Sequence, residues 1–178
     1  IDVNQDTYIL AESAPNANED TLTFFTDSNQ RMIIDKIGNV GIGITIPGEK
    51  LDVDGKVQAT SFNATSDARL KDNITPLNNP LMKIIQLQGV NFTWKKEDST
   101  SLNAGLIAQD IEKVIPEVVT TLDNEMQQKS VNYNGLIPYL IESVKTLSNE
   151  IDNLKLENEA MKEKMKQYDV WFAQLLNK

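Results

Sequence analysis

The sequence contains no cysteine and no histidine among its 178 residues. Without cysteine there is neither a disulfide framework nor a thiolate nucleophile, and without histidine the commonest metal ligand and general base are missing. We therefore expect no metal and no cofactor. Any catalysis has to rely on the side chains of Ser, Thr, Lys, Asp or Glu.

Positive charge is also scarce, because 17 Lys and Arg residues stand against 26 Asp and Glu residues and give a net charge of −9. A nucleic-acid partner needs a basic surface that displaces counterions from phosphate, so we expect none. An anionic membrane is disfavoured for the same reason, and no run of about 18 apolar residues predicts a membrane span. The chain begins IDVNQDTYIL rather than with Met, and we expect it to be part of a longer polypeptide.

Aromatic residues make up only 6% of the chain, which disfavours one dense core and favours an elongated or oligomeric protein. Residues 1–65 predict a β-rich stalk of short strands separated by turns. We expect strands at 32–34, 40–46, 51–53 and 57–62, with turns at Gly38-Asn39, Pro47-Gly48 and Asp54-Gly55.

Glycine occupies every second position at Gly41 and Gly43 in the segment NVGIGIT. This alternation favours close approach of the backbone to a neighbouring strand or to another copy of the chain. The edges of such short strands would be exposed in a monomer, and intertwining with sister chains would remove them.

Residues 66–133 change character and predict a compact α+β unit, in which a helix packs on a small antiparallel sheet. We expect a short helix with Asn79 as its N-cap and Pro80 first, running through Gln86. A strand over GVNFTW should place Val90, Phe92 and Trp94 on one face. The remaining elements are a helix within 105–115 that stops before Pro116, and two strands joined at Asp123-Asn124.

From Tyr133 onward the apolar residues follow a heptad repeat, and residues 134–178 predict one long helix that begins around Gly135. At about 40 residues it would be roughly 60 Å long, which implies a partner helix. The seam is apolar or aromatic except at Asn158, and consists of Tyr133, Ile137, Leu140, Val144, Leu147, Ile151, Leu154, Asn158, Met161, Met165, Tyr168, Phe172 and Leu175.

Asn158 has two interpretations. A polar residue at an a position fixes the register and oligomeric state of a coiled coil, because its amide seeks a partner across the interface. Alternatively, the helix bends back along its own domain and Asn158 faces water. The heptads alone permit two, three or four strands.

The segment NATSDARLKDNI, residues 63–74, is the candidate for chemistry. With His and Cys absent, a serine nucleophile at Ser66 needs another base, and Lys71 is available. Lysine acts as a base only as the neutral amine, which burial or nearby positive charge would favour. Arg69 could supply that charge or could simply pair with Asp67. The purely structural alternative is a helix N-cap at Thr65 or Ser66 with Asp67 in the first turn.

The order of three motifs resembles a known family. SDARLKDNI at 66–74, GLIAQDIEKVIPEVV at 105–119 and YNGLIPYLIESVKTL at 133–147 precede a long coiled-coil helix. Together they resemble the self-cleaving C-terminal intramolecular chaperone domain of phage tail spikes, tail fibres and endosialidases. The segment GNVGIGITIPGEKLDVDGKVQATSF is similar to the β-rich stalk upstream of such domains, and a phage neck appendage is one possible source.

The resemblance implies a homotrimer that forms through the C-terminal helix and the α+β core and aligns the upstream fibre or spike segments of the same chain. The chaperone then releases itself by single-turnover serine autoproteolysis in cis, with Ser66 as nucleophile and Lys71 as base. The upstream part would belong to the virion, in a tail or appendage fibre. The chaperone would act in the host cytoplasm during assembly.

The scissile bond follows from ring size. The Ser66 hydroxyl reaches the carbonyl of Thr65 through a five-membered ring, an N-to-O acyl shift, and water then hydrolyses the ester. Attack by Ser66 on its own carbonyl would need a four-membered ring, so cleavage between Ser66 and Asp67 requires another nucleophile. That position remains the alternative.

Five residues match the family motifs with weaker assignments. Asp67 and Arg69 would orient the loop or tune Lys71, or would form a salt bridge that holds the turn. Asn73 would cap the turn or donate to an oxyanion. Gln109 and Asp110 would support the core or the subunit interface, and only weakly the site itself.

Two other functions fit the same sequence. The first is a purely structural trimeric fibre tip that binds a receptor and never cuts. The second is a conventional Ser-Lys peptidase that acts in trans, which is disfavoured because no substrate-binding segment is evident.

Overall fold

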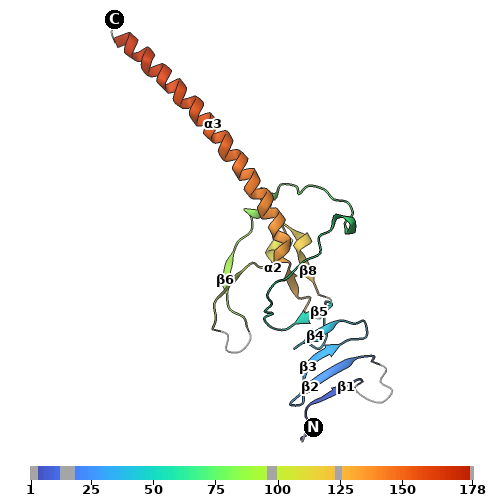
Figure 1. Cartoon of the computed structure of the whole chain (residues 1–178). Coiled ribbons are helices and arrows are strands. Elements are labelled where there is room, and N and C mark those ends of the chain that lie inside the picture. The colour runs from blue at the N-terminus through green and yellow to red at the C-terminus, as the bar shows by residue number, and fades with distance from the viewer. Residues whose placement is uncertain (1–3, 13–18, 96–99, 123–125, 177–178) are drawn as a thin grey trace. The chain divides into compact units, whose positions relative to one another are not determined.

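The computed structural model describes residues 4–12, 19–95, 100–122 and 126–176. These residues form two compact units that divide between Asp72 and Asn73. The first unit is a β-sheet followed by an open segment, and the second combines short helices, two hairpins and one long helix (Figure 1). The α+β class expected from the sequence is confirmed.

The first unit contains one five-stranded sheet whose strands follow one another in chain order. The first four strands are antiparallel neighbours, and the fifth pairs in parallel with the fourth. Their bounds are β1 Tyr8–Leu10, β2 Leu22–Thr26, β3 Asn29–Ile34, β4 Val40–Ile42 and β5 Leu51–Val53.

Two turns of this sheet follow directly from residue type. Asp27 and Ser28 both have positive φ, of 53° and 54°, which is the geometry that a tight hairpin between right-twisted strands requires. Between β3 and β4, Oδ1 of Asp35 accepts hydrogen bonds from the backbone N–H groups of Ile37 and Asn39, at 2.9 and 2.8 Å. Gly38 supplies the positive φ of 77° that closes this turn.

The glycine pattern predicted close approach, and the structure shows it at Gly41. A Cβ there would lie 2.7 Å from the backbone oxygen of Ile44 and 2.9 Å from Cγ2 of Ile33 on β3, so the approach is to atoms of the same chain, one of them on a neighbouring strand. Gly43 has a φ of 70°, and β4 ends at Ile42 instead of running through residue 46 as predicted.

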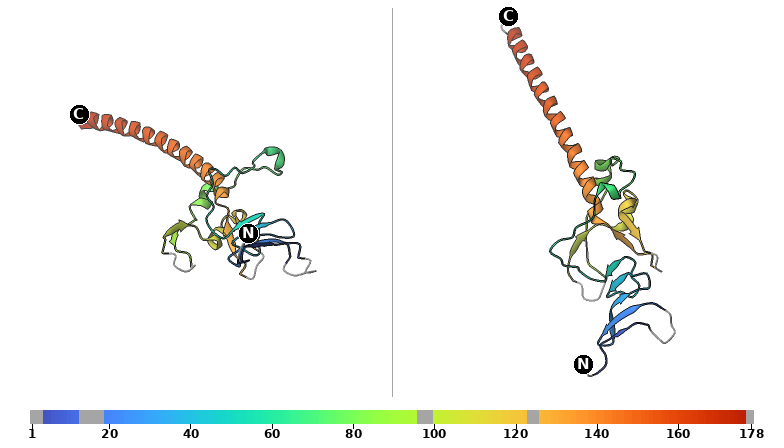
Figure 2. Two further views of the ribbon diagram at one scale, coloured as in Figure 1. Left: turned by 60° about the horizontal axis from the view of Figure 1, so that its bottom comes forward. Right: turned by 45° about the vertical axis from the view of Figure 1, so that its right-hand side comes forward.

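The strand predicted at 57–62 is wrong. Residues 57–62 form no strand, and every one of them is exposed. A strand needs a neighbour that accepts its backbone hydrogen bonds, and this segment pairs with no strand of the described chain. Beyond β5 the described chain runs as an open segment to a single 3₁₀ turn, η1, Ala68–Leu70 (Figure 2).

The sheet lacks a hydrophobic core within its own chain. Among the described residues, every buried apolar side chain of the core cluster belongs to the second unit, whereas Thr23 and Asn39 are the buried polar residues of the sheet. Large apolar residues of this unit remain exposed, among them Ile9 at 62% and Leu51 at 58%. Both values are high for a sheet that would be stable alone.

The second unit contains two separate antiparallel hairpins and three helices, with 3₁₀ turns between them. The antiparallel part therefore consists of two two-stranded sheets. The element bounds are α1 Pro80–Ile84, β6 Val90–Phe92, β7 Asn103–Gly105, α2 Ala108–Glu112, η2 Pro116–Val118, β8 Val119–Thr121, β9 Lys129–Val131, η3 Tyr133–Leu136 and α3 Ile137–Leu176.

The predicted ends of the short helices need correction. Pro80 opens α1 and Asn79 is its N-cap, but Asn79 is left-handed with a φ of 48° and makes no side-chain cap bond. The helix ends at Ile84, short of Gln86. Helix α2 has only five residues, and it ends before Pro116 as expected. Trp94 lies outside β6 and is exposed, although its ring packs edge-on against Phe92. The turn predicted at Asp123-Asn124 lies outside the described residues.

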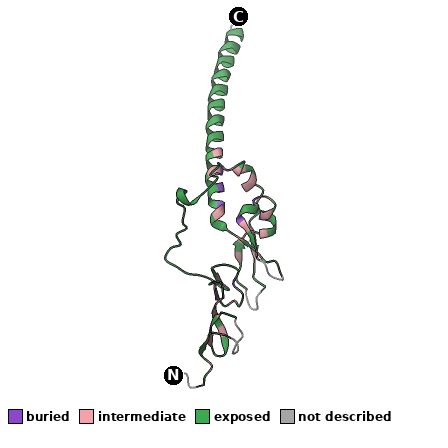
Figure 3. Ribbon diagram, turned by 90° about the vertical axis from the view of Figure 1, so that its right-hand side faces the viewer, coloured by how far each residue is buried: buried purple, intermediate pink, exposed green. Residues whose placement is uncertain are grey.

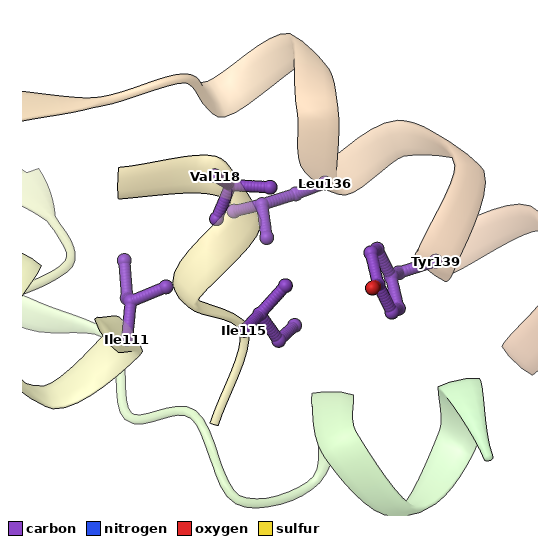
Figure 4. Packing of buried hydrophobic residues seen from close by; sticks show 5 residues of the cluster. All are labelled: Ile111, Ile115, Val118, Leu136 and Tyr139. Atoms are coloured by element: carbon purple, nitrogen blue, oxygen red, sulfur yellow. The ribbon is translucent and has the colours of Figure 1, made fainter. Parts of the chain in front are cut away.

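The core of the second unit is formed by five buried side chains from α2, the chain after it, η2, η3 and α3 (Figure 4). Ile111 and Ile115 are four residues apart, so they lie on one side of the helical stretch, and both are at most 1% exposed. Val118, Leu136 and Tyr139 complete the cluster.

Helix α3 is 40 residues long and follows η3, whose N-cap Asn132 accepts a hydrogen bond from the Gly135 N–H at 3.1 Å. Only its first turns contribute buried side chains, and every residue from Ile151 to Leu176 is exposed (Figure 3). The helix curves gently along its length (Figure 2). Within the described residues, no helix combines the length and apolarity needed to span a membrane.

Candidate functional site

The candidate site is a contact between Ser66 and Lys71, in which Nζ of Lys71 donates a hydrogen bond of 2.7 Å to Oγ of Ser66. The 3₁₀ turn η1 lies between the two residues. Its backbone bonds run from Leu70 N to Asp67 O and from Lys71 N to Ala68 O, each at 3.1 Å. A spacing of five residues therefore becomes a direct contact because the chain turns back on itself.

Asp67 caps this turn. Its Oδ1 accepts a hydrogen bond of 2.9 Å from the backbone N–H of Arg69, and the Arg69 guanidinium contacts both carboxylate oxygens, most closely at 2.6 Å. These side-chain and backbone bonds from Arg69 lower the pKa of Asp67, and the same pair raises the pKa of Arg69. The cap is Asp67, so the alternative with Thr65 or Ser66 as the cap is wrong. Arg69 pairs with Asp67.

The site is open to solvent in the single chain. Thr65, Ser66, Asp67, Arg69 and Lys71 are all exposed. The desolvation that favours a neutral lysine is therefore not supplied by the described residues of this unit.

The other predicted residues belong to the second unit. Asn73 has a left-handed φ of 53° and is exposed. Gln109 and Asp110 lie on the exposed side of α2, where Asp110 pairs with Lys113 at 2.8 Å. The structure thus brings together Ser66, Lys71, Asp67 and Arg69. The roles of Asn73, Gln109 and Asp110 stay predictions.

A second polar cluster was not predicted from the sequence. The Tyr139 hydroxyl donates to Oε1 of Glu117, and Nζ of Lys83 lies 3.5 Å from the same oxygen and 5.3 Å from the centroid of the Tyr139 ring. Since 34 residues separate Lys83 from Glu117, no local pattern could reveal this contact. The cluster joins α1 and η2 to the start of α3, beside the core.

The environment of this cluster shifts three pKa values. The hydrogen bond from Tyr139 is the largest influence on Glu117 and lowers its pKa, with Lys83 adding to the effect. Burial, together with the bond to Glu117, raises the pKa of Tyr139. Burial alone would lower the pKa of Lys83, but its contacts with Tyr139 and Glu117 outweigh burial and raise it. All three groups are therefore held in the protonation states that favour the contact.

The second unit also has an open pocket of about 320 Å³, lined by Pro76, Leu77, Pro138, Ile141 and Glu142. It contains none of the predicted site residues. Among the described residues, no group of three or more Asp and Glu side chains is placed to hold a metal ion.

Comparison with known proteins confirms the resemblance read from the motifs. Residues 66–120 match the model of the family Peptidase_S74, described as "Chaperone of endosialidase". The matched range begins at Ser66 and includes η1, α1 and α2. The third motif, at 133–147, lies beyond it.

Long tail fibre proteins of phages are similar in sequence. The long tail fiber protein Gp37 of Enterobacteria phage K3 and that of Enterobacteria phage T2 are each 33% identical over 105 residues, which covers 56% of this chain and 8% of each relative. Gp37 of Salmonella phage S16 is 29% identical over 119 residues, covering 63% of this chain and 16% of the relative. The chain therefore spans only a small part of the length of these relatives.

The solved structures that are similar include the carboxy-terminal domain of the bacteriophage T5 L-shaped tail fiber with its intra-molecular chaperone domain. The likeness covers 80% of this chain and 47% of that chain, with a TM-score of 0.42 and 14% identity. At that TM-score the likeness carries no structural argument.

Proposed function

We propose that this chain ends a phage fibre or spike with an intramolecular chaperone that drives homotrimerisation and then releases itself by cleavage near Thr65-Ser66. The 2.7 Å contact between Ser66 and Lys71 carries this proposal, because it lies where the family match begins. Residues 1–65 would be the end of the mature fibre, 66–133 the chaperone core and 134–178 its coiled-coil helix.

The cleavage step follows from the chemistry of the two side chains. The neutral amine of Lys71 removes the proton of the Ser66 hydroxyl through the existing contact, and Oγ attacks the carbonyl carbon of Thr65. The bond between that carbon and the Ser66 nitrogen breaks, and the lysine ammonium returns the proton to the nitrogen. The product is an ester between Thr65 and Oγ of Ser66.

Water then hydrolyses the ester, which restores the Ser66 hydroxyl and leaves a new carboxylate on Thr65. The nucleophile cuts the bond next to it in its own chain, so each copy turns over once. The released fragment starts at Ser66. A fragment that starts at Asp67 would require a nucleophile other than Ser66.

Two apolar surfaces that are exposed in a single chain support assembly. The sheet of the first unit has no buried apolar core residue among those described, and the apolar seam of α3 is exposed along the helix. Other copies of the chain would cover both surfaces. They would also enclose the open segment around Ser66 and Lys71, which would supply the desolvation that a neutral lysine needs. The number three rests on the family resemblance.

The matched relatives are tail fibre proteins. We place residues 1–65 and the segment before them in the virion, in a tail or appendage fibre. The chaperone part would act in the host cytoplasm while the fibre assembles, and would be discarded afterwards.

A second candidate is a structural trimeric fibre tip that binds a receptor without cutting. The exposure of both Ser66 and Lys71 favours it, since the single chain does not desolvate the base. Denaturing electrophoresis of freshly purified protein separates the two functions. The chaperone gives two fragments from wild type and one full-length band from Ser66→Ala, whereas the structural tip gives one band from both.

A matched control is available in the same open segment. Ser61 is exposed like Ser66 but lies outside the turn, so Ser61→Ala should cut like wild type. Native mass spectrometry of the Ser66→Ala protein should give a trimer. A monomeric Ser66→Ala protein would contradict the proposed assembly role.

A further inference from the structure

Helix α3 carries opposite charges at a spacing of five residues. Three such pairs flank the apolar seam, namely Glu150 with Lys155, Glu157 with Lys162, and Lys164 with Asp169. Along one helix, side chains three or four residues apart are neighbours, and side chains five apart are not. The described ion pairs inside α3 all join residues three apart, namely Glu142 with Lys145, Asp152 with Lys155 and Glu163 with Lys166.

Three of these charges, Glu150, Glu157 and Lys164, have no charged residue three or four positions away on their own helix, and those around Glu150 are Thr146, Leu147, Asn153 and Leu154. The residues three and four positions from Glu157 are Asn153, Leu154, Ala160 and Met161. Those around Lys164 are Ala160, Met161, Gln167 and Tyr168. All three side chains are exposed, and no other described residue covers the helix from Ile151 to Leu176.

The heptad repeat places these charges beside the apolar seam. With Ile137, Val144 and Ile151 at a, Glu150, Glu157 and Lys164 occupy g positions, and Lys155, Lys162 and Asp169 occupy e positions. In a parallel coiled coil without offset, each g residue faces the e residue of the neighbouring copy that comes five residues later. All three pairs then bring opposite charges together.

We infer that these six charges specify a parallel, unstaggered assembly of α3 with other copies of the same chain, and that Lys164 and Asp169 lock its register. This inference deepens the proposed function, because it rests on the copies associating through α3. The occupant of the exposed seam is a second copy of this chain, identified by the complementarity of its charges.

The lock arises because the signs are inverted in one heptad. The first two pairs have Glu at g and Lys at e, whereas the third has Lys at g and Asp at e. If one helix slipped by a heptad in one direction, Glu157 would face Asp169 of the neighbour. In the other direction Lys164 would face Lys162. An uninverted pattern would keep opposite charges together in either slip, so the inversion is what penalises it.

Antiparallel pairing fits the charges less well. There g faces g and e faces e, so Glu150 and Glu157 face g residues of the neighbour, which include the same glutamates, and Lys155 and Lys162 face e residues, which include the same lysines. An a residue also faces a d residue in that arrangement, and every d residue of the seam is apolar or aromatic, so Asn158 would meet no second amide. In the parallel arrangement without offset, every Asn158 lies in one layer.

Asn158 can bond across that layer. Its Nδ2 donates to the backbone oxygen of Leu154 at 2.9 Å, and its Oδ1 accepts no hydrogen bond within the described chain. An amide from another copy at the same level would satisfy it, which agrees with the role of a polar a residue in fixing register.

Register matters for the strands that the helix aligns. A slip of one heptad would displace one chain by about 10 Å at the helical rise. This is about three residues of a strand, and an odd offset turns each side chain to the opposite face of its sheet. Copies held level by Lys164 and Asp169 would enter the fibre with equivalent residues at equivalent heights.

The strength of the lock is tested in the full chain with Ser66→Ala, so that the protein stays at full length. Lys164→Glu and Asp169→Lys each create a repulsive pair, and each should lower the association constant at low salt by on the order of tenfold. The two substitutions together restore attraction and should restore the constant. Lys166→Glu and Glu163→Lys, on the outer face, are matched controls, and far-UV circular dichroism checks the helix in every variant.

The register itself is tested with cysteines, since the natural chain has none. Under mild oxidation, Met161→Cys chains should link to each other, and so should Leu175→Cys chains. A mixture of Leu154→Cys and Met161→Cys chains should give almost no mixed disulfide. In chains that also carry Lys164→Glu with Asp169→Lys, the mixed disulfide should rise several-fold because slippage is no longer penalised.

Three outcomes would overturn the inference. If the single charge variants associate as tightly as the outer-face controls, the proposed charge pairs between chains do not form. In chains with the natural charges, mixed disulfides that are as abundant as like-with-like disulfides would show that α3 has no fixed register. Leu175→Cys chains that fail to link while Met161→Cys chains do would indicate antiparallel helices. None of these measurements depends on cleavage. A wild-type protein that never cuts itself would therefore contradict only the proposed autoproteolysis.

Discussion

Nζ of Lys71 lies 2.7 Å from Oγ of Ser66, across a 3₁₀ turn whose N-cap is Asp67. The turn is local, because all of its hydrogen bonds join residues between 66 and 71. The two side chains therefore meet within a single chain, whereas the desolvation of the amine depends on what surrounds the segment.

Replacing Lys71 by Arg tests the role of the amine as a base. Arginine keeps the positive charge and the ability to donate to Ser66, but its guanidinium is not deprotonated in proteins. We expect Lys71→Arg to lower the cleavage rate by about 100-fold or more, without loss of assembly. A denaturing gel time course measures the rate, and Lys56→Arg in the same open segment is the control. Cleavage of Lys71→Arg at the wild-type rate would exclude Lys71 as the base.

Replacing Asp67 tests the turn that holds the pair together. Asp67→Ala removes the cap and the partner of Arg69, so we expect cleavage to slow by on the order of tenfold, while Asp67→Asn keeps an oxygen at the cap and should restore most of the rate. Asp72→Ala, at an exposed acidic residue beside Lys71, is the control. Equal rates in Asp67→Ala and Asp72→Ala would show that the cap has no positioning role.

The pKa of Asp67 sets the pH range in which the cap is effective. Hydrogen bonds from Arg69 lower this pKa below its ordinary value of 3.8. A carboxyl group with a depressed folded-state pKa contributes above its ordinary pKa and loses that contribution as the pH falls through the folded-state value. At any pH above about 5, titration of Asp67 should therefore not change the cleavage rate.

The Tyr139 and Glu117 contact should stabilise the second unit. Tyr139→Phe keeps the ring and removes the hydrogen bond, and we expect a loss of about 1 kcal/mol in the free energy of unfolding at pH 7. Chemical denaturation at matched protein concentration measures it, with Tyr168→Phe on the exposed part of α3 as control. The pKa of Glu117 lies below its ordinary value of 4.5, so its contribution is present above that pH and is lost as the pH falls through the folded-state value.

The difference between wild type and Glu117→Gln should accordingly shrink as the pH is lowered below about 4.5. A difference that stays constant from pH 7 to pH 3 would show that the charge on Glu117 is not what stabilises the contact. The effect will be modest, since the Glu117 side chain is 51% exposed and water screens it.

Gly105, the last residue of β7, lies against the side chains of Tyr133 and Phe92. A Cβ at this position would lie 2.8 Å from the Tyr133 hydroxyl oxygen, which accepts a hydrogen bond of 3.0 Å from the Leu106 N–H, and 3.1 Å from Cε1 of Phe92. Gly105→Ala should lower the free energy of unfolding by about 1–3 kcal/mol. Gly89→Ala, where a Cβ meets nothing within 4 Å, is the control. Similar stability of both variants would contradict the crowding at Gly105.

The sequence predicted best the features that depend on local pattern. The heptads from Tyr133 predicted a long helix, and α3 runs from Ile137 to Leu176 with its seam uncovered. Ser66 and Lys71 were paired on chemical grounds, and their contact is made by a turn of six residues. Pro80 and Pro116 marked the start of α1 and a limit to α2 because proline has only local effects on the backbone.

Features that depend on distant contacts were not predicted. A strand was expected at 57–62 from its apolar residues, but no strand of the described chain pairs with it. The cap of η1 is a local exception: the structural alternative of a cap at Thr65 or Ser66 is wrong, although the pairing of Asp67 with Arg69 was one of the predicted roles. Lys83 on α1 and Glu117 on η2 meet because both lie beside Tyr139 at the start of α3, and a sequence carries no local sign of such packing.

Intact mass spectrometry of wild type and Ser66→Ala after equal incubation tests the central claim most directly. The account predicts two wild-type fragments whose masses correspond to residues 1–65 and 66–178, and a single full-length mass for Ser66→Ala. A full-length wild type would contradict self-cleavage, and a fragment that begins at Asp67 would contradict the acyl shift at Ser66.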